Sequence, residues 1–172
     1  MPLSPIPNDN DITPLPRPDG LYIQSSTPKG RGIFTSKLIP SGTTIEISST
    51  LILSPRENTT HIEHTVLYHY TYNWPLLNPS TGEPTGRTTQ AVVFGLGSMF
   101  NHSTREQNVG WTRDLERNFI VYRALRDIQP GEELCISYGD RLTFEDADGS
   151  AVNGDERLES EEEHLGRIQL GT

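Results

Sequence analysis

Apolar and polar residues alternate in several short stretches of this 172-residue chain, and a period of two predicts β-strands. The longest stretch covers residues 43–54, with apolar side chains at Ile45, Ile47, Leu51 and Leu53 and an irregularity between the two pairs. Further strands are predicted at 21–26, 32–36, 91–94, 108–113, 118–125 and 133–139. Turns are expected between the first two of these strands and at Pro130-Gly131, which suits the centre of a type II turn.

Residues 59–74 follow a helical spacing instead, and they predict the one clear helix of the chain. Thr60 and Glu63 have the spacing of a capping box, and Trp74-Pro75 is a natural helix end. The face expected to be buried consists of Ile62, Val66, Leu67 and Tyr70. Residues 78–89 predict a loop. Many short strands with one helix predict a β-rich α+β domain.

The two ends of the chain differ in composition from its middle. Residues 1–19 are crowded with proline and predict a flexible arm. The C-terminal segment, 146–172, is polar and acidic, with a pattern compatible with a short helix; together with Glu145 it carries most of the net charge of −9. Double-stranded nucleic acid is an unfavourable direct ligand for such a chain, whereas a basic peptide or protein is a favourable one. A tail that serves only solubility is the alternative.

Composition limits the classes of protein further. Hydrophobic residues make up 33% of the chain, which suits one domain with additional segments outside its core. No apolar run approaches the length of a membrane span, and the N-terminal sequence lacks the layout of a secretory signal. The lone Cys135 excludes an internal disulfide and a cysteine-built zinc site.

Common catalytic and metal-binding patterns do not account for the polar residues. The histidines at 61, 64 and 69 do not have a spacing that brings three imidazoles together, so no metal site is expected. His102 and Ser103 are adjacent and no serine elbow is present, which argues against a hydrolase triad. Residues 29–32, Lys-Gly-Arg-Gly, lack the remaining residues of a phosphate-binding loop.

Three segments remain, in a fixed order: KGRGIF at 29–34, GLGSMFNHS at 95–103 and GEELCISYGD at 131–140. Together they resemble the SET-domain family of protein lysine methyltransferases, most closely its compact fungal and viral single-domain members. The resemblance covers residues 20–145, with a variable insert at about 54–90. It implies several small sheets, a pseudoknot-like C-terminal arrangement and S-adenosylmethionine as the methyl donor.

The same resemblance implies a set of residues that hold the cofactor. A Gly-x-Gly turn lets the backbone approach a ligand closely, and an asparagine side chain offers both a donor and an acceptor. The backbone of the histidine in the second segment is implied to bind the adenine. For Tyr70, packing alone is a nearly equal alternative. The cofactor-binding set is Lys29, Gly30, Arg31, Gly32, Tyr70, Asn101 and His102.

Tyr138 is implied to be the catalytic residue. Methyl transfer to an amine needs alignment and desolvation rather than a covalent intermediate, and a phenol can align the methyl donor with the lysine nitrogen. The lysine must arrive neutral, although its free pKa is about 10.4. The resemblance places Trp111, Tyr122 and Ile136 along the lysine channel, with core packing as the alternative for the two aromatic residues. An aliphatic residue at 136 leaves room, so higher methylation states are predicted.

Two departures from the family pattern affect these assignments. Gln107 stands where the family has proline, with one added residue, which loosens the alignment of the strand containing Trp111. The cysteine cluster that follows the domain in many members is absent from the sequence. Another segment must then close the cofactor pocket, and Phe144 with the C-terminal segment, or a partner chain in a homodimer, are the candidates.

The sequence therefore predicts a protein-lysine N-methyltransferase for which a histone tail is the favoured substrate. A non-histone protein substrate and a non-catalytic SET-fold binding module are the alternatives. We expect a basic lysine-containing partner, no direct nucleic-acid or membrane binding, and a nuclear location with the cytoplasm as the alternative.

Overall fold

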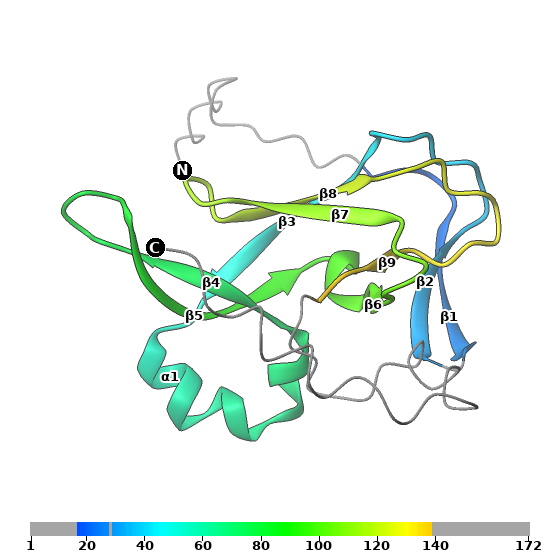
Figure 1. The fold of residues 1–172 in the computed structure, drawn as a ribbon. Coiled ribbons are helices and arrows are strands. Elements are labelled where there is room, and N and C mark those ends of the chain that lie inside the picture. The colour runs from blue at the N-terminus through cyan, green and yellow to red at the C-terminus, as the bar shows by residue number, and fades with distance from the viewer. Residues whose placement is uncertain (1–16, 28, 139–172) are drawn as a thin grey trace, which may run out of the picture.

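The computed structural model describes residues 17–27 and 29–138, which form small β-sheets around one core (Figure 1). The strands are β1 Leu21–Thr27, β2 Gly30–Thr35, β3 Thr44–Ile52, β4 Thr71–Leu77, β5 Pro84–Phe94, β6 Asn101–His102, β7 Val109–Asp114, β8 Phe119–Ala124 and β9 Cys135–Ile136. The helical elements are α1 Pro55–Thr60 and the 3₁₀ turns η2 Ile62–His64, η3 Val66–Tyr70 and η4 Leu96–Met99. This β-rich architecture confirms the predicted fold class.

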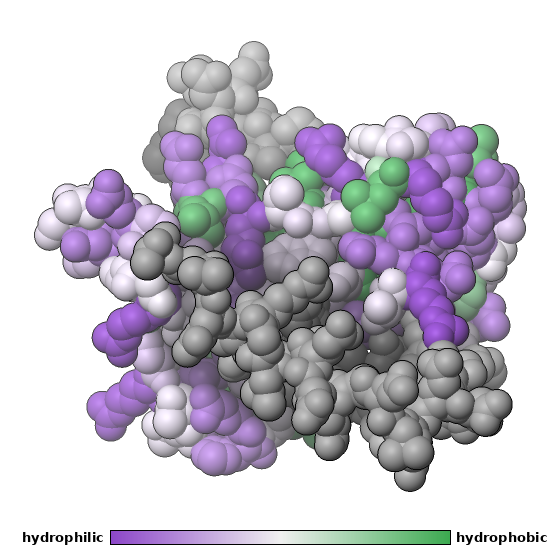
Figure 2. Space-filling model, viewed as in Figure 1, coloured by the Kyte–Doolittle hydropathy of each residue, from purple (hydrophilic) through white to green (hydrophobic). Residues whose placement is uncertain are grey.

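Five of the strands form one antiparallel sheet in the order β4-β5-β3-β8-β7. The β4–β5 hairpin extends beyond the rest of the molecule in Figure 1, and that part of Figure 2 carries mainly hydrophilic and neutral residues. β4 is an edge strand, which explains why it tolerates Pro75, a residue without a backbone N–H. The β7–β8 hairpin pairs Trp111 with Tyr122 and thereby places two aromatic side chains on one face of the sheet.

The core lies where this sheet meets the two smaller ones, β1-β2 and β6-β9. Trp74, Phe100 and Tyr122 are its largest fully buried side chains, and most of the others are isoleucine, leucine and valine. β6 and β9 pair in parallel, with Asn101 beside Cys135. Segments more than thirty positions apart therefore lie side by side at the centre of the molecule.

The predicted turn at Pro130-Gly131 is confirmed. Gly131 has a φ of 88°, and the N–H of Glu132 donates to the carbonyl of Gln129 over 3.1 Å. The N–H of Gly131 also donates to the carbonyl of Thr35 over 2.6 Å. This second bond ties the start of the C-terminal motif to the end of β2.

The predicted helix at 59–74 is wrong. The helix α1 begins earlier, because Ser54 rather than Thr60 is the N-cap: its side chain accepts from Glu57 N, and Glu57 returns a bond to Ser54 N. Thr65 is extended and separates two short 3₁₀ turns, and residues 71–77 pair with β5 as a strand. The expected buried face is not buried, since Val66 is 79% exposed.

Two smaller expectations also need correction. The predicted loop at 78–89 is too long, because β5 begins at Pro84 and continues to Phe94. The irregularity of β3 lies between Thr44 and Glu46, where its register with β8 shifts, and not between Ile47 and Leu51. Leu51 is 51% exposed, so apolar alternation overstated the burial of the second half of this strand.

Candidate functional site

The three sequence motifs meet around β6 and β9. Asn101 donates its Nδ2 hydrogens to the carbonyl of Arg31 over 3.0 Å and to Oε1 of Glu133 over 2.7 Å. A Cβ on Gly32 would overlap the carboxylate of Glu133 and crowd the amide of Asn101. Glycine at 32 therefore allows the carboxylate of Glu133 to lie directly against the backbone of the first motif, and a larger residue would displace this side chain.

His102 joins the second motif to the third. It is 7% exposed, and its Nδ1 accepts from the backbone N–H of Tyr138 over 3.1 Å. An accepting Nδ1 places the proton of the neutral ring on Nε2, which faces Oγ1 of Thr104 at 3.1 Å. The carbonyl of His102 accepts from Nζ of Lys29 over 3.1 Å, so the first motif also reaches this residue.

Tyr138 lies at the edge of this junction, directly after β9. Its hydroxyl donates to the carbonyl of Phe100 over 2.7 Å, and its ring lies 5.3 Å from that of His102. Burial, assisted by the neighbouring Cys135 and Tyr70, raises the pKa of Tyr138 to about 12. The phenol is therefore neutral at physiological pH, while 39% of the residue stays exposed to an incoming partner.

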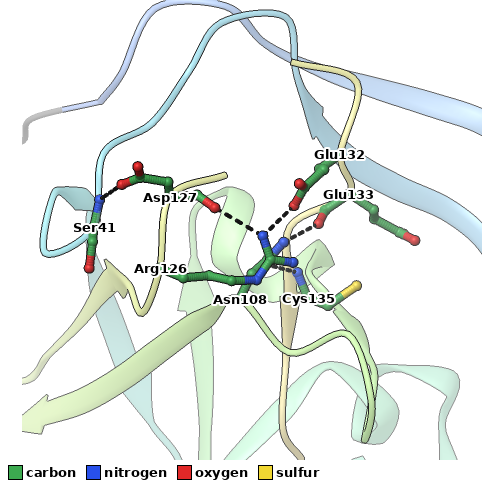
Figure 3. Close-up of polar contacts among 7 residues, drawn as sticks. All are labelled: Ser41, Asn108, Arg126, Asp127, Glu132, Glu133 and Cys135. Atoms are coloured by element: carbon green, nitrogen blue, oxygen red, sulfur yellow. Dashed lines mark hydrogen bonds and ion pairs between the residues drawn. The ribbon is translucent and has the colours of Figure 1, made fainter. Parts of the chain in front are cut away.

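Asn108 holds the third motif in place from below (Figure 3). Its Nδ2 donates to the carbonyl of Glu133 over 2.7 Å, and its Oδ1 accepts from the N–H of Cys135 over 2.9 Å. The residue is 1% exposed, so both bonds are protected from water. The adjoining turn is fixed by Arg126, which donates to Oε2 of Glu132 over 2.7 Å. We refer to Gly32, Asn101, His102, Asn108 and Tyr138 as the motif junction.

A second group, the aromatic wall of Tyr72, Trp111 and Tyr122, lies beside the motif junction. Tyr122 donates its hydroxyl to that of Tyr72 over 3.1 Å, and Tyr72 donates to the carbonyl of Gly97 over 3.1 Å. The rings of Tyr72 and Trp111 meet edge to face at 5.2 Å. Nε1 of Trp111 donates to the carbonyl of Ser137 over 3.2 Å, which joins the wall to the residue before Tyr138.

Burial keeps the two tyrosines of the aromatic wall neutral. It raises the pKa of Tyr72 and of Tyr122 well above the ordinary value for tyrosine, chiefly by desolvation of the phenolate. A Cβ on Gly97 would overlap the ring of Tyr122, so η4 presses directly against the wall. Ile136 is fully buried in β9. Tyr122 is also fully buried, so Tyr72 and Trp111 are the residues of the wall that another molecule could reach.

Glu46 is a buried carboxylate beneath this wall. It is 4% exposed, and its Oε2 accepts from the backbone N–H of Gly97 over 2.8 Å and from the hydroxyl of Ser48 over 3.0 Å. Its Oε1 pairs with Arg17 over 2.6 Å. The carboxylate therefore joins β3 to η4 through Gly97 and to the segment before β1 through Arg17, and it also accepts from Ser48 on its own strand.

The structure brings together most of the residues predicted from the sequence. Lys29, Asn101, His102 and Tyr138 contact one another directly or through one residue. Tyr70 lies at the end of η3, 44% exposed, close enough to influence the pKa of Tyr138. Gln107, in place of the family's proline, donates to the carbonyl of Val109 over 3.1 Å at the start of β7.

Sequence reasoning missed Tyr72, Glu46 and Asn108. Tyr72 lies two residues from the predicted Tyr70, and only the strand pairing of β4 shows which of the two faces the wall. Asn108 ends the NHSTREQN segment, so its place in the motif was the available signal. Glu46 carried a signal of its own, because an acidic residue falls between two isoleucines in a strand.

Other expectations fall outside the described residues or concern metals and membranes. Phe144, the C-terminal segment and residues 1–16 of the arm lie outside the described residues. Within residues 17–27 and 29–138, no group of three or more His, Cys, Asp or Glu could hold a metal ion. The helices in this part of the chain are all too short to cross a membrane.

The motif junction fits the amino-acid end of the cofactor that the resemblance implies. Both amide hydrogens of Asn101 are used within the protein, whereas its Oδ1 accepts no hydrogen bond from the described residues and can accept from an ammonium group. A Cβ on Gly30 would meet open space, and its φ of 87° favours glycine. The residues therefore leave both an acceptor and room for a small charged ligand.

Comparisons with known proteins identify the family of this chain. A family model described as the SET domain matches residues 30–139. A Schizosaccharomyces pombe relative, "Histone-lysine N-methyltransferase, H3 lysine-37 specific", is 45% identical over 150 residues, which are 87% of this chain and 94% of that protein. A crystal structure of a Plasmodium falciparum protein, assigned there to the histone methyltransferases, is 25% identical and covers 71% of this chain and 95% of its own, with a TM-score of 0.47 that is too low to support a fold.

The family match spans well over half of the chain, and the yeast relative matches nearly its whole length. The chain therefore belongs to the SET-domain family of protein lysine methyltransferases, enzymes that use S-adenosylmethionine.

Proposed function

We propose that this protein is a histone-lysine N-methyltransferase that acts on histone H3, at the lysine that corresponds to the target of the yeast relative. The main support is that the 45% identity to the H3 lysine-37-specific enzyme extends over 87% of the chain, across both the motif junction and the aromatic wall. We further propose residues 20–145 as the catalytic domain, with an insert at about 54–90, an arm at 1–19 and an acidic segment at 146–172.

The motif junction is proposed to hold the cofactor, which supplies an electrophilic methyl group when bound. Asn101 accepts the ammonium group at Oδ1, and the turn from Lys29 to Gly32 closes around the same end. The backbone of His102 faces the adenine. In this structure Nζ of Lys29 donates to the carbonyl of His102. This hydrogen bond must weaken if the same carbonyl is to accept from the adenine of the cofactor.

Tyr138 is proposed to align the acceptor amine. Its hydroxyl hydrogen is committed to the carbonyl of Phe100, which fixes the position of the oxygen. The oxygen lone pairs of a neutral phenol accept hydrogen bonds, so an amine N–H directed at them is held in one orientation. Alignment of this kind supplies much of the rate in a direct displacement.

The lysine channel is proposed to run past the partly exposed Tyr72 and Trp111, with the buried Tyr122 and Ile136 behind them. Trp111 and Tyr122 were predicted for this role, and Tyr72 joins them because it contacts both. Ile136 has no hydroxyl to hold a water or restrain a methylated amine, so di- and trimethylated products are expected. Mass spectrometry that finds only monomethylated product would contradict this.

The partner is a basic histone tail, and the acidic C-terminal segment would attract it. A histone substrate implies a nuclear, chromatin-directed role, with the cytoplasm as the alternative if the substrate is another protein. A homodimer remains a prediction; its support is the exposed apolar side chains of η3, Val66, Leu67 and Tyr70, the last of which is close enough to influence the pKa of Tyr138. Light scattering of the purified chain measures the mass directly.

Labelled methyl transfer tests the function. The full chain is incubated with labelled S-adenosylmethionine and either histone H3, H3 lacking the target lysine, or a cell extract. Label on intact H3 alone is expected. Label on other proteins of the extract but not on H3 would favour a non-histone substrate, and no label with retained cofactor binding would favour a binding module.

The variant Tyr138→Phe tests the proposed role of the phenol. Activity is expected to fall by about 10²-fold or more, because the aligning oxygen is lost. Tyr22→Phe is the matched control, since Tyr22 is 40% exposed on β1 and stacks on Phe34 through its ring alone. Full activity of Tyr138→Phe would reject the assignment.

A further inference from the structure

Arg113 is a charged residue of the site that none of the sequence motifs contains. It lies two positions after Trp111 on β7, so both side chains project from the same face of the sheet. Its Cζ lies 4.6 Å from the centroid of the Trp111 ring, and its Nε donates to the carbonyl of Asn73 on β4 over 3.0 Å. The guanidinium is thereby fixed between the aromatic wall and the edge strand.

The charge of Arg113 has no carboxylate partner among the described residues. Burial lowers the pKa of this guanidinium, and the neighbouring Tyr72 acts in the opposite direction. An arginine nevertheless remains charged at any physiological pH. A positive charge thus lies against the Trp111 ring, in a residue that is exposed to solvent and has no carboxylate partner among the described residues.

The other ionisable groups around the wall do not cancel this charge. Tyr72, Tyr122 and Tyr138 have raised pKa values and are neutral. The carboxylate of Glu46 is paired with Arg17 beneath the wall. Other titratable groups near Tyr138 are Glu133, which accepts from the amide of Asn101, the imidazole of His102, the thiol of Cys135 and the phenol of Tyr70 on η3.

We propose that Arg113 is a positioning residue for the charge state of the substrate: through the ring of Trp111 it disfavours a lysine ammonium in the channel and so promotes the neutral amine. The inference rests on the proposed function. A nearby like charge lowers the pKa of an ammonium, in the same direction as desolvation by the aromatic wall. The proton passes to water, and the nitrogen lone pair becomes available for attack.

Two peptides separate this electrostatic role from a packing role. Both span the proposed target site of histone H3; one carries lysine at the target position and the other carries norleucine, which has similar length and no charge. Binding of each to the full chain is measured by calorimetry at a pH near neutrality, without methyl donor. The wild-type protein is expected to bind the norleucine peptide more tightly.

Arg113→Gln removes the charge while keeping a polar side chain that can reach Asn73. The preference for norleucine is expected to fall by about 3- to 10-fold, which corresponds to about half to one pH unit in the pKa of the bound lysine. The ascending limb of the kcat–pH profile should move to higher pH by the same amount. Arg113→Lys should keep the wild-type preference, because it keeps the charge.

Arg117→Gln is the control for loss of one positive charge from the same hairpin. Arg117 is an exposed partner of Asp114, away from the wall, and its removal should leave both readouts unchanged. An unchanged norleucine preference in a folded Arg113→Gln protein would overturn the inference alone. Failure of the wild-type chain to bind either peptide and to label H3 would overturn the proposed function and this inference together.

Discussion

The motif junction and the aromatic wall, the two halves of the proposed site, are stabilised differently. In the junction, buried polar side chains bind backbone groups of distant segments, as Asn108 binds Glu133 and Cys135. In the wall, ring packing dominates, and a short chain of hydroxyls from Tyr122 through Tyr72 ends on the carbonyl of Gly97. A lost partner therefore leaves buried backbone groups unpaired in the junction, whereas in the wall it mainly changes the polarity of an aromatic surface.

This difference matches the two tasks that the halves are proposed to perform. A cofactor must be held in one geometry, which suits backbone positions fixed by hydrogen bonds. A lysine side chain must slide in and lose a proton, which suits smooth apolar rings with a nearby charge. Substitutions in the junction should consequently reduce stability first, and substitutions in the wall should alter activity more than stability.

The largest effect is expected from Asn108→Leu in the motif junction. The substitution keeps the volume but leaves the carbonyl of Glu133 and the N–H of Cys135 without their partner in a buried position. A loss of about 2–4 kcal/mol in the free energy of unfolding is expected, measured by urea denaturation. Asn78→Ala, at an exposed turn, is the control and should cost under about 1 kcal/mol. Equal losses in the two variants would show that burial does not increase the contribution of the two Asn108 hydrogen bonds to stability.

A smaller loss is expected from Glu46→Gln, beneath the aromatic wall. The carboxylate accepts three hydrogen bonds, and an amide in its place turns one acceptor oxygen into a donor that faces Arg17 or the N–H of Gly97. Stability should fall by about 1–2 kcal/mol, because one charge-assisted bond is lost. Differential scanning calorimetry measures this. A variant as stable as the wild type would mean that the wall does not depend on the buried charge.

Local patterns predicted the parts of the fold whose burial alternates regularly. Strands β7 and β8 were predicted almost to the residue, because each alternates and the two are neighbours in the chain. The helix predicted at 59–74 was wrong for a physical reason. Val66, Leu67 and Tyr70 have helical spacing, yet they lie in one 3₁₀ turn on the surface. Their apolar character does not reflect packing within the described residues, so periodicity misled the prediction.

The candidate site could be predicted as far as its motifs reach. Asn101, His102 and Tyr138 lie within recognisable motifs, and the resemblance assigned them to one site. Asn108 was signalled only by its place in the NHSTREQN segment, and Glu46 only by its acidic character within a strand. Most of their partners lie far along the chain, and no local pattern encodes those contacts. Tyr72 was missed because the segment was taken for one helix, whereas the 3₁₀ turn ends at Tyr70 and a strand begins at Thr71.

A loss of about 1 kcal/mol or less is expected from Tyr72→Phe in the aromatic wall. The change removes one hydroxyl, so the hydroxyl of Tyr122 loses its acceptor and the carbonyl of Gly97 loses a donor. The rate of methyl transfer should fall more strongly than stability. Both are measured on the same preparation, stability by thermal unfolding and activity by the initial rate of methyl transfer. A stability loss comparable to that of Asn108→Leu would erase the distinction between the two halves.

The smallest effect is a pH dependence at Tyr138, where the two halves meet. Burial raises the pKa of this phenol from 10.0 to about 12 in the folded protein, so its neutral form contributes stability that is fully present below pH 10 and is lost as pH rises through about 12. Tyr138→Phe has no proton to lose, and its free energy of unfolding should fall less steeply over that range. Chemical denaturation of both proteins at several alkaline pH values measures the difference. Parallel curves would mean that Tyr138 is solvated like an ordinary surface tyrosine, and the hydrogen bond to Phe100 could then not fix the oxygen that the proposed alignment requires.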